Sequence, residues 1–204
     1  MVSAPSMIRV RLGELSDLPQ LEIIELETAP MFPPSALPPE LARPLPTAVL
    51  AAGVAASLLW VAENAPAEVV GFVVCERFAS ALHIAEMDVR PSFGRKGVGT
   101  RLLFQVCAAA KDFGLQFVTL TTFSHLPWNA PFYAKHGFSA LENLEEFPHL
   151  EAALRHERER GLDNRIAMIK GLVSGRQQTE LVANQSSKRA QYQSALSTYM
   201  WTFL

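Results

Sequence analysis

The residues whose types and spacing suit chemistry gather in one turn, Pro91–Gly99, and at the start of the helix predicted to follow it. The turn carries three glycines, which can adopt φ > 0 and let a ligand approach the backbone closely. A helix N-terminus adds unbonded N–H groups and about half a positive charge. Full positive charges stand beside it at Arg95, Lys96 and Arg101. The combination favours an anion site, most simply for phosphate, and the alternative is a solvated turn that happens to be basic.

Two common phosphate-binding motifs are excluded. A P-loop ends in Gly-Lys-Ser/Thr, but Thr100 follows Gly99 with no lysine between them. The dinucleotide pattern G-x-G-x-x-G begins at Gly97 and Gly99 and then meets Leu102 where the third glycine belongs.

The strand before the turn changes phase. Leu82 and Ile84 alternate with polar neighbours, whereas the later apolar positions are Met87 and Val89. This shift predicts a β-bulge between Ile84 and Met87, which would leave backbone groups able to bond another molecule.

This segment resembles motif A of the GNAT N-acetyltransferase superfamily, in which a strand ending in Val-x-Pro precedes Arg/Gln-x-x-Gly-x-Gly/Ala. Val89-Arg90-Pro91 and Gly97-Val98-Gly99 match the pattern, but Gly94 stands at the Arg/Gln position and Arg95 follows it. The stretch from Trp128 to Phe138 resembles the family's Asn-x-x-x-Tyr helix, which ends in Gly-Phe. The chain is therefore similar to a small GNAT enzyme of the bacterial type.

The resemblance covers roughly residues 8–172 and implies the GNAT fold. That fold is α/β (α+β), with a mixed, mostly antiparallel central sheet, a bulged and splayed strand pair, and helices on both faces. Residues 173–204 lie outside the resemblance and are rich in Ser, Gln, Thr and Ala. We expect them to form a weakly ordered tail or a packed extension, which ends in the aromatic run 199–204.

Hydrophobic periodicity predicts the elements of residues 8–172 in more detail. One early helix would start at Ser16 or Asp17 and end near Thr28, with an apolar stripe of Leu18, Leu21 and Ile24 that could extend to Leu26. The segment 30–39 is too rich in proline for a regular helix. Strands are predicted over 8–11, 58–63, 69–77, 82–89, 117–122, 138–141 and 165–170, and further helices over 47–52, 97–113, 129–136 and 149–160. The strand 117–122 follows a helical crossover, so it should run parallel to the strand 82–89.

The resemblance also implies that acetyl-CoA is the cosubstrate and that an amine is the acceptor. The CoA pyrophosphate would meet the turn and the helix start, and the pantetheine would pair with the Val89 backbone like an added strand segment. Asn129 would bind the coenzyme, cap its own helix, or do both. The implied binding residues are Val89, Arg90, Arg95, Lys96, Gly97, Val98, Gly99, Thr100, Arg101 and Asn129.

Glu86 is the first candidate for the general base, because it lies at the predicted bulge and partial burial would raise its pKa toward the operating pH. Asp88, then His83, and water are the alternatives. The resemblance indicates Tyr133 as the general acid for the leaving thiolate, with Phe132 beside it as the better core residue. The alternative is that the three strand residues face solvent and that Tyr133 is a core aromatic.

The acceptor is not specified by the sequence. Carboxylates near a pocket would suit a cationic amine, and two groups of glutamates are available: Glu22, Glu25 and Glu27 in the early helix, and Glu142, Glu145 and Glu146 after Phe138. They are equally compatible with a solvated surface. A CoA-binding regulatory or interaction domain without turnover, and a homodimer, also stay open.

Composition limits other functions. A net charge of −2 leaves no basic surplus for a nucleic-acid backbone. Cys75 and Cys107 each lie in an apolar run, which indicates buried thiols in a reducing compartment such as the cytoplasm. The histidines lack metal-ligand spacing, so no metal is expected. The longest apolar run, 48–62, is shorter than the ~20 residues of a membrane span, so no membrane is expected either.

Overall fold

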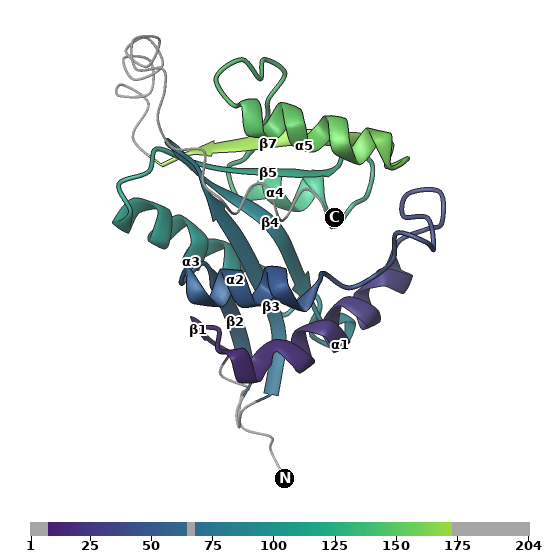
Figure 1. The fold of residues 1–204 in the computed structure, drawn as a ribbon, viewed down its shortest axis with the longest axis vertical. Helices are drawn as coiled ribbons and strands as arrows, with labels where there is room; N and C mark the ends of the chain where they lie inside the picture. Colours follow the sequence, from purple (N-terminus) through teal and green to yellow (C-terminus); the bar gives the residue numbers. More distant parts are fainter. Residues whose placement is uncertain (1–7, 65–67, 173–204) are drawn as a thin grey trace. The chain divides into compact units, whose positions relative to one another are not determined.

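The computed structural model describes residues 8–64 and 68–172. Its strands form one sheet in the order β1-β2-β3-β4-β5-β7-β6 (Figure 1). The strands are β1 (Arg9–Leu12), β2 (Leu59–Asn64), β3 (Glu68–Arg77), β4 (Ala81–Val89), β5 (Phe117–Phe123), β6 (Ser139–Ala140) and β7 (Arg165–Gly171). The α-helices are α1 (Leu18–Thr28), α2 (Thr47–Ala55), α3 (Val98–Asp112), α4 (Ala130–Lys135) and α5 (Pro148–Glu159). These bounds agree with the predicted elements to within a few residues, except that the strand predicted over 138–141 has only two residues.

The described residues divide into two compact units. The first unit comprises residues 8–76 and 84–106, and the second comprises 77–83 and 107–172. The chain passes from one unit to the other within β4 and again within α3. The predicted tail, residues 173–204, lies outside the described residues.

In the first unit, β1 pairs with β2 and β2 pairs with β3, in both cases antiparallel. The register shifts between Ala62 and Glu63, since Ala62 lies opposite Gly71 and Glu63 lies opposite Val69. Val70 is therefore an extra residue on β3, a bulge that the sequence pattern did not reveal. Its carbonyl accepts a hydrogen bond of 2.9 Å from the Arg90 amide.

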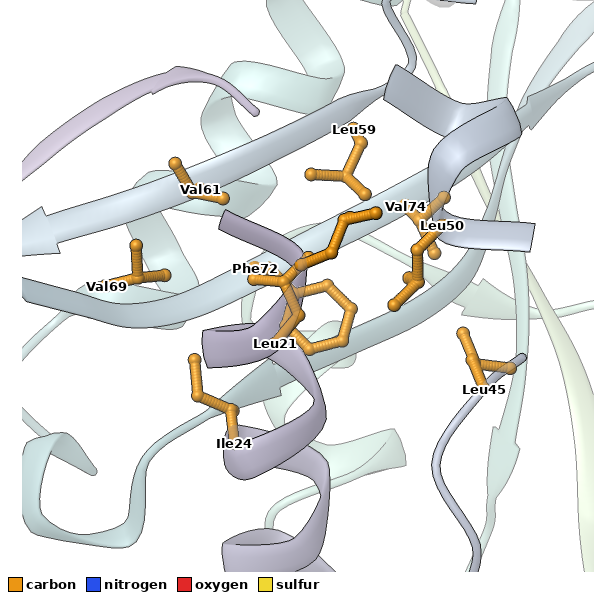
Figure 2. Close-up of a cluster of buried hydrophobic side chains, with 10 residues drawn as sticks. Leu21, Ile24, Leu45, Leu50, Leu59, Val61, Val69, Phe72 and Val74 are labelled. Carbon is orange, nitrogen blue, oxygen red and sulfur yellow. The ribbon is translucent and has the colours of Figure 1, made fainter. Parts of the chain in front are cut away.

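Helices α1 and α2 are held on this sheet by one apolar cluster (Figure 2). Leu21 and Ile24 of α1 are fully buried against side chains of β2 and β3. Full burial of each such side chain contributes about 1.5–3 kcal/mol. The cluster comprises Leu18, Leu21, Ile24, Leu45, Leu50, Leu59, Val61, Val69, Phe72 and Val74. Leu26 does not extend the stripe, because it lies about 200° around the helix from Ile24 and is 52% exposed.

In the second unit, β5 pairs antiparallel with β7 along its whole length, and β6 pairs antiparallel with β7. The start of β4 lies beside β5. The amides of Gln116 and Phe117 donate to the Ser80 carbonyl at 2.9 and 3.1 Å, and His83 meets Thr119 three residues further along. Because the residue numbers increase in the same direction along both strands, the two strands run parallel, as predicted.

Two further expectations concern the segments between these elements. The proline-rich segment 30–39 contains no α-helix, only the end of the 3-10 turn Ala29–Met31 and further turns, as predicted. Both cysteines, Cys75 and Cys107, are buried thiols, also as predicted. Among residues 8–64 and 68–172, every helix is too short or too polar to cross a membrane.

A polar cluster is buried in the second unit between β4, β5 and α5. The Thr119 hydroxyl lies 3.2 Å from both His83 Nδ1 and His149 Nε2, and Phe78 stacks on the His149 ring at 4.0 Å. Burial lowers the pKa of His149 to about 4. Burial, with the nearby His149 and Arg165, lowers the pKa of His83 well below its ordinary value. Both rings are therefore neutral in the folded chain at neutral pH.

We expect this cluster to make the second unit sensitive to acid. An unfolded histidine binds a proton below about pH 6.5, whereas folded His149 stays neutral down to about pH 4. Stability should fall as the pH drops from 6.5 toward 4, by up to about 1.4 kcal/mol per pH unit for each histidine. His149→Gln should flatten this part of the curve of Tm against pH, whereas His125→Gln, at an exposed position, should not. Parallel curves for His149→Gln and wild type would contradict a neutral buried ring.

Candidate functional site

The glycine turn leads into an open, cationic helix start. After β4 the chain makes a 3-10 turn, Pro91–Phe93, and α3 begins at Val98. The Arg101 amide donates to the Gly97 carbonyl at 3.1 Å, which marks the first turn of the helix. Val98 is buried and anchors this end, whereas Arg95, Lys96 and Arg101 are exposed. The positive end of the helix dipole and three cations therefore share one surface.

Gly97 has the left-handed backbone conformation, with φ of +81°. Nothing lies within 4 Å of the position that a Cβ atom would take there. Glycine is therefore required by the backbone angle rather than by crowding, and the space over the turn is open. These two properties suit a backbone cradle for an anion.

The departure from the family pattern at positions 94 and 95 has a structural counterpart. Gly94 has φ of −56°, which any residue adopts, whereas Arg95 has φ of +60°. A Cβ atom at position 94 would lie 3.1 Å from the Pro91 carbonyl oxygen. The turn therefore favours glycine at position 94, and the neighbouring cation is supplied by Arg95 in a left-handed conformation.

The second half of β4 turns polar side chains toward α1. Ala85 packs against the apolar cluster that holds α1, and Asp88 hydrogen-bonds with the Thr28 side chain of the same helix. In a regular strand, residues three apart face opposite sides of the sheet. Both face α1 here, so the strand changes phase between them, which supports the predicted bulge.

Three carboxyl groups influence one another in the first unit: those of Glu25 on α1 and of Glu86 and Asp88 on β4. Glu25 is only 8% exposed. Its Oε1 accepts a hydrogen bond of 3.0 Å from the Leu45 amide, and its Oε2 is buried with no hydrogen-bond partner. Burial raises the pKa of Glu25 to about 8. Burial, and then the charges of Glu86 and Glu25, raise the pKa of Asp88 well above its ordinary value.

The three side chains proposed as the general base differ in their surroundings. Burial and the neighbouring carboxyl groups raise the pKa of Asp88 well above its ordinary value, and its side chain is engaged with Thr28. His83 is 3% exposed and its ring is hydrogen-bonded to Thr119 inside the second unit. Glu86 is half-buried and lies beside two carboxyl groups whose pKa values are raised. The structure therefore favours Glu86 among the three.

Arg90 does not join the exposed cations of the turn. Its guanidinium lies 3.7 Å from the Glu27 carboxylate and 4.0 Å from the Glu68 carboxylate. Its charge is thus directed at carboxylates of the first unit. The neighbouring residue Val89, the last of β4, is half-buried at the end of the strand.

Asn129 lies directly before α4 in the second unit. Its side chain does not cap the helix. Its Nδ2 donates to Thr122 Oγ1 at 3.0 Å, and its Oδ1 is buried with no hydrogen-bond partner. Asn129 therefore offers an acceptor atom that a ligand N–H group would satisfy.

The burial of Tyr133 and Phe132 in α4 is the reverse of what the sequence predicts. Tyr133 is the more buried, at 8% exposed, and packs edge-on against Phe132 and Phe138 at 5.2 and 5.7 Å. Phe132 is half-exposed and contacts the His136 ring at 4.5 Å. The expectation that Phe132 takes the core position is wrong, because His136, one turn later, gives Phe132 a neighbour at the rim.

The structure thus brings some of the predicted residues together within a unit. The first unit holds the turn, Glu86 and Asp88, and the second holds Asn129 and Tyr133.

Glu25 was named from the sequence only as one of three glutamates in the early helix, and not as a buried residue. Its spacing, four residues after Leu21 and three before Thr28, is the signal that places it on the buried face. Within the part of the chain that the structure describes, no three His, Cys, Asp or Glu side chains are placed to hold a metal ion.

Comparisons with known proteins agree with this geometry. Residues 55–140 match the family model described as the acetyltransferase (GNAT) domain. N-acetylglutamate synthase from Neisseria gonorrhoeae, solved with coenzyme A and N-acetyl-glutamate, is 18% identical with a TM-score of 0.62, over 84% of this chain and 36% of that one. This chain therefore spans about a third of the length of that synthase.

Two shorter proteins are similar over nearly their whole length. PaiA N-acetyltransferase from Thermoplasma acidophilum, solved with coenzyme A, is 18% identical with a TM-score of 0.60, over 81% of this chain and 99% of that one. The ribosomal-protein-S18-alanine N-acetyltransferase from Escherichia coli is 14% identical with a TM-score of 0.58, over 83% and 96%. At these identities the likeness shows the fold, and it confirms the fold class predicted from the sequence. The splay of the strand pair stays a prediction.

Glu25 should make the first unit less stable as the pH rises. Folded Glu25 keeps its proton up to about pH 8, whereas an unfolded glutamate loses it near pH 4.5. Between these values the folded state binds more protons, so stability falls with rising pH. Glu25→Gln keeps an oxygen for the Leu45 amide and should raise Tm more at pH 8 than at pH 5. Glu22→Gln, at an exposed position of the same helix, is the control. Equal shifts at both pH values for Glu25→Gln would contradict the raised pKa.

Proposed function

We propose that the chain is a member of the GNAT superfamily, as its match to the acetyltransferase (GNAT) domain supports, and that it transfers the acetyl group of acetyl-CoA directly to a primary amine of a small molecule or peptide. The observation that carries the proposal is the turn around Gly97. There a left-handed glycine, open space over the backbone and exposed cations meet at the start of α3.

The turn fits a pyrophosphate by its backbone first and by its side chains second. A helix N-terminus favours an anion by about 0.3–1 kcal/mol at an exposed site, and each amide of the first turn adds a directed donor. Exposed ion pairs contribute up to about 1 kcal/mol each and are weakened by salt. Arg95, Lys96 and Arg101 therefore attract and orient the coenzyme, and the conformation of Gly97 determines whether the amides can reach it.

The coenzyme's pantetheine arm carries two amides that need partners in a low-dielectric site. The buried, unpartnered Oδ1 of Asn129 would accept one N–H group. The backbone at Val89, at the end of β4, would pair with another part of the arm as an added strand does. Asn129 fits its role through an acceptor atom that lacks a hydrogen-bond partner in the chain. Val89 fits its role through its place at the end of a strand.

Acetyl-CoA supplies an acetyl group activated as a thioester. The chain must take a proton from the amine and give one to the departing thiolate. We assign the first task to Glu86, which is half-buried, whereas Asp88 beside it is engaged with Thr28 and has a raised pKa. We assign the second to Tyr133, whose position is fixed by two aromatic neighbours. A phenol has a pKa near 10, close to that of a thiol, so the proton transfer is well matched.

Two further parts of the proposal concern the acceptor and the location. The carboxyl groups of Glu25, Glu86 and Asp88 favour an acceptor that arrives as a cation, since a nearby positive charge favours the ionised form of each carboxyl group. The two buried free thiols favour a reducing compartment, for which we propose the cytoplasm.

Coenzyme binding at the turn is tested with two matched glycines that lie before and after α3. Acetyl-CoA at about 100 times its Kd should raise Tm by roughly 5–10 °C. Gly97→Ala and Gly114→Ala both place a side chain at positive φ in open space, and each should cost about 1–2 kcal/mol of stability. Only Gly97→Ala should also remove the shift caused by acetyl-CoA, because only this residue lies in the turn. No shift for the wild-type chain at millimolar acetyl-CoA would sink the proposal.

Turnover is tested by the release of free thiol with a panel of amines. Glu86→Gln and Tyr133→Phe should each lower turnover by about 100-fold while the acetyl-CoA shift in Tm stays near that of the wild type. Glu86→Gln should also weaken the acidic limb of the pH–rate profile, since the base acts in its ionised form. Tyr133→Phe with a much lower Tm and unchanged activity would show that the hydroxyl is a core hydrogen bond. Coenzyme binding without thiol release from any amine would favour a binding domain without turnover.

A further inference from the structure

Helix α1 is apolar on two faces. One face packs on the sheet through Leu21 and Ile24. The other carries a second row of apolar residues, which we call the outer stripe. These residues are spaced by four, four, three and four positions, as on one side of a helix. The outer stripe comprises Pro19, Ile23 and Leu26 of α1, with Leu15 and Pro30 in the 3-10 turns before and after the helix. All five residues are exposed, with Leu15 at 63%, Ile23 at 46% and Leu26 at 52%.

The surroundings of the outer stripe are acidic. Glu22 and Glu27 lie on its two sides around the helix, and Glu27 also approaches Arg90 at 3.7 Å. Residues 12–42 contain no Lys or Arg, and four of their six Asp and Glu are exposed: Glu14, Glu22, Glu27 and Glu40. The other two are buried, Asp17 in an ion pair with Arg11 and Glu25 on the opposite face of α1. A partner for this surface should therefore be apolar and basic, and a second copy of α1 would fail because its own glutamates would face these.

The chain contains one segment of this kind. Residues 188–204 begin with Lys188 and Arg189 and contain no Asp or Glu. Their apolar residues Tyr192, Leu196, Tyr199 and Phe203 are spaced by four, three and four positions, the same interval pattern as the outer stripe. The 32 residues after Leu172 span up to about 100 Å when extended, against a diameter of about 40 Å for a globular chain of this length. Their reach does not limit where they bind.

We propose that the outer stripe of α1 is the docking surface for residues 188–204 of the same chain. The apolar residues of the segment cover Leu15, Ile23 and Leu26, and Lys188 and Arg189 face the glutamates beside them. The opposite side of α1 carries Glu25, so docking braces the helix that holds this carboxyl group. The proposal is independent of the acetyl-transfer function, and its tests use no coenzyme.

A disulfide trap tests the contact directly. The native thiols of Cys75 and Cys107 are buried, so new cysteines on the surface report alone under mild oxidation. Ile23→Cys with Phe203→Cys should form an intramolecular disulfide in most monomeric molecules, detected as a faster band on a non-reducing gel. Glu151→Cys with Phe203→Cys, on an exposed position of α5, measures random encounters of the segment and should form at least fivefold less. Equal yields for the two pairs, or disulfide-linked dimers in place of the intramolecular product, would overturn the proposal.

A labelling experiment tests the surface without a trapped bond. Leu26→Cys should react with a maleimide at least tenfold more slowly in the full chain than in a chain that ends at residue 187. Lys188→Glu with Arg189→Glu should remove most of this protection, and adding Glu22→Lys with Glu27→Lys should restore it. Ala108→Cys, at an exposed position of α3, should react equally in all these chains. Equal labelling of Leu26→Cys in the full and shortened chains contradicts docking on α1.

Discussion

The burial of acidic side chains against β4 is the constraint on which the candidate site depends. Helix α1 is held on the sheet by Leu21 and Ile24, and the same face carries Glu25 into the interior beside the carboxyl groups of β4. A buried carboxylate costs several kcal/mol, and the group avoids this cost by keeping its proton. The raised pKa values of Glu25 and Asp88 leave Glu86 as the carboxyl group to which we assign the proton transfer in the proposed function. The packing that builds the first unit thus supports this assignment.

The phase change in β4 is what makes this arrangement possible. Before it, Ala81 and His83 belong to the second unit, where the strand runs parallel to β5. After it, Asp88 faces α1, and the chain enters the turn that ends at Gly97. A regular strand would turn Asp88 to the opposite side from Ala85. One local irregularity therefore sets both the direction of the carboxyl groups and the path into the start of α3.

Much of this arrangement was predictable from the sequence because it depends on local periodicity. The strand 82–89, the helix from Val98 and the parallel direction of β5 follow from the spacing of apolar residues and the helical crossover. The features that were missed depend on tertiary contacts. Val70 is an extra residue only relative to the register of β2, and the ring contact of Phe132 with His136 at the rim is likewise visible only in the folded chain. The burial of Glu25 depends on Leu45, twenty residues away, whose amide binds its carboxyl group.

Buried polar atoms without partners do not all carry the same meaning. Both carboxyl oxygens of Glu76 and one of Glu25 are buried and unpartnered, and the pKa of each group rises, to about 7 and about 8. An acid can thus reduce the cost of burial by taking up a proton. The amide oxygens of Asn64 and Asn129 have no such route, so each unsatisfied acceptor costs about 1–3 kcal/mol until a donor arrives. Under the proposed function, an N–H group of the coenzyme would satisfy Asn129 Oδ1.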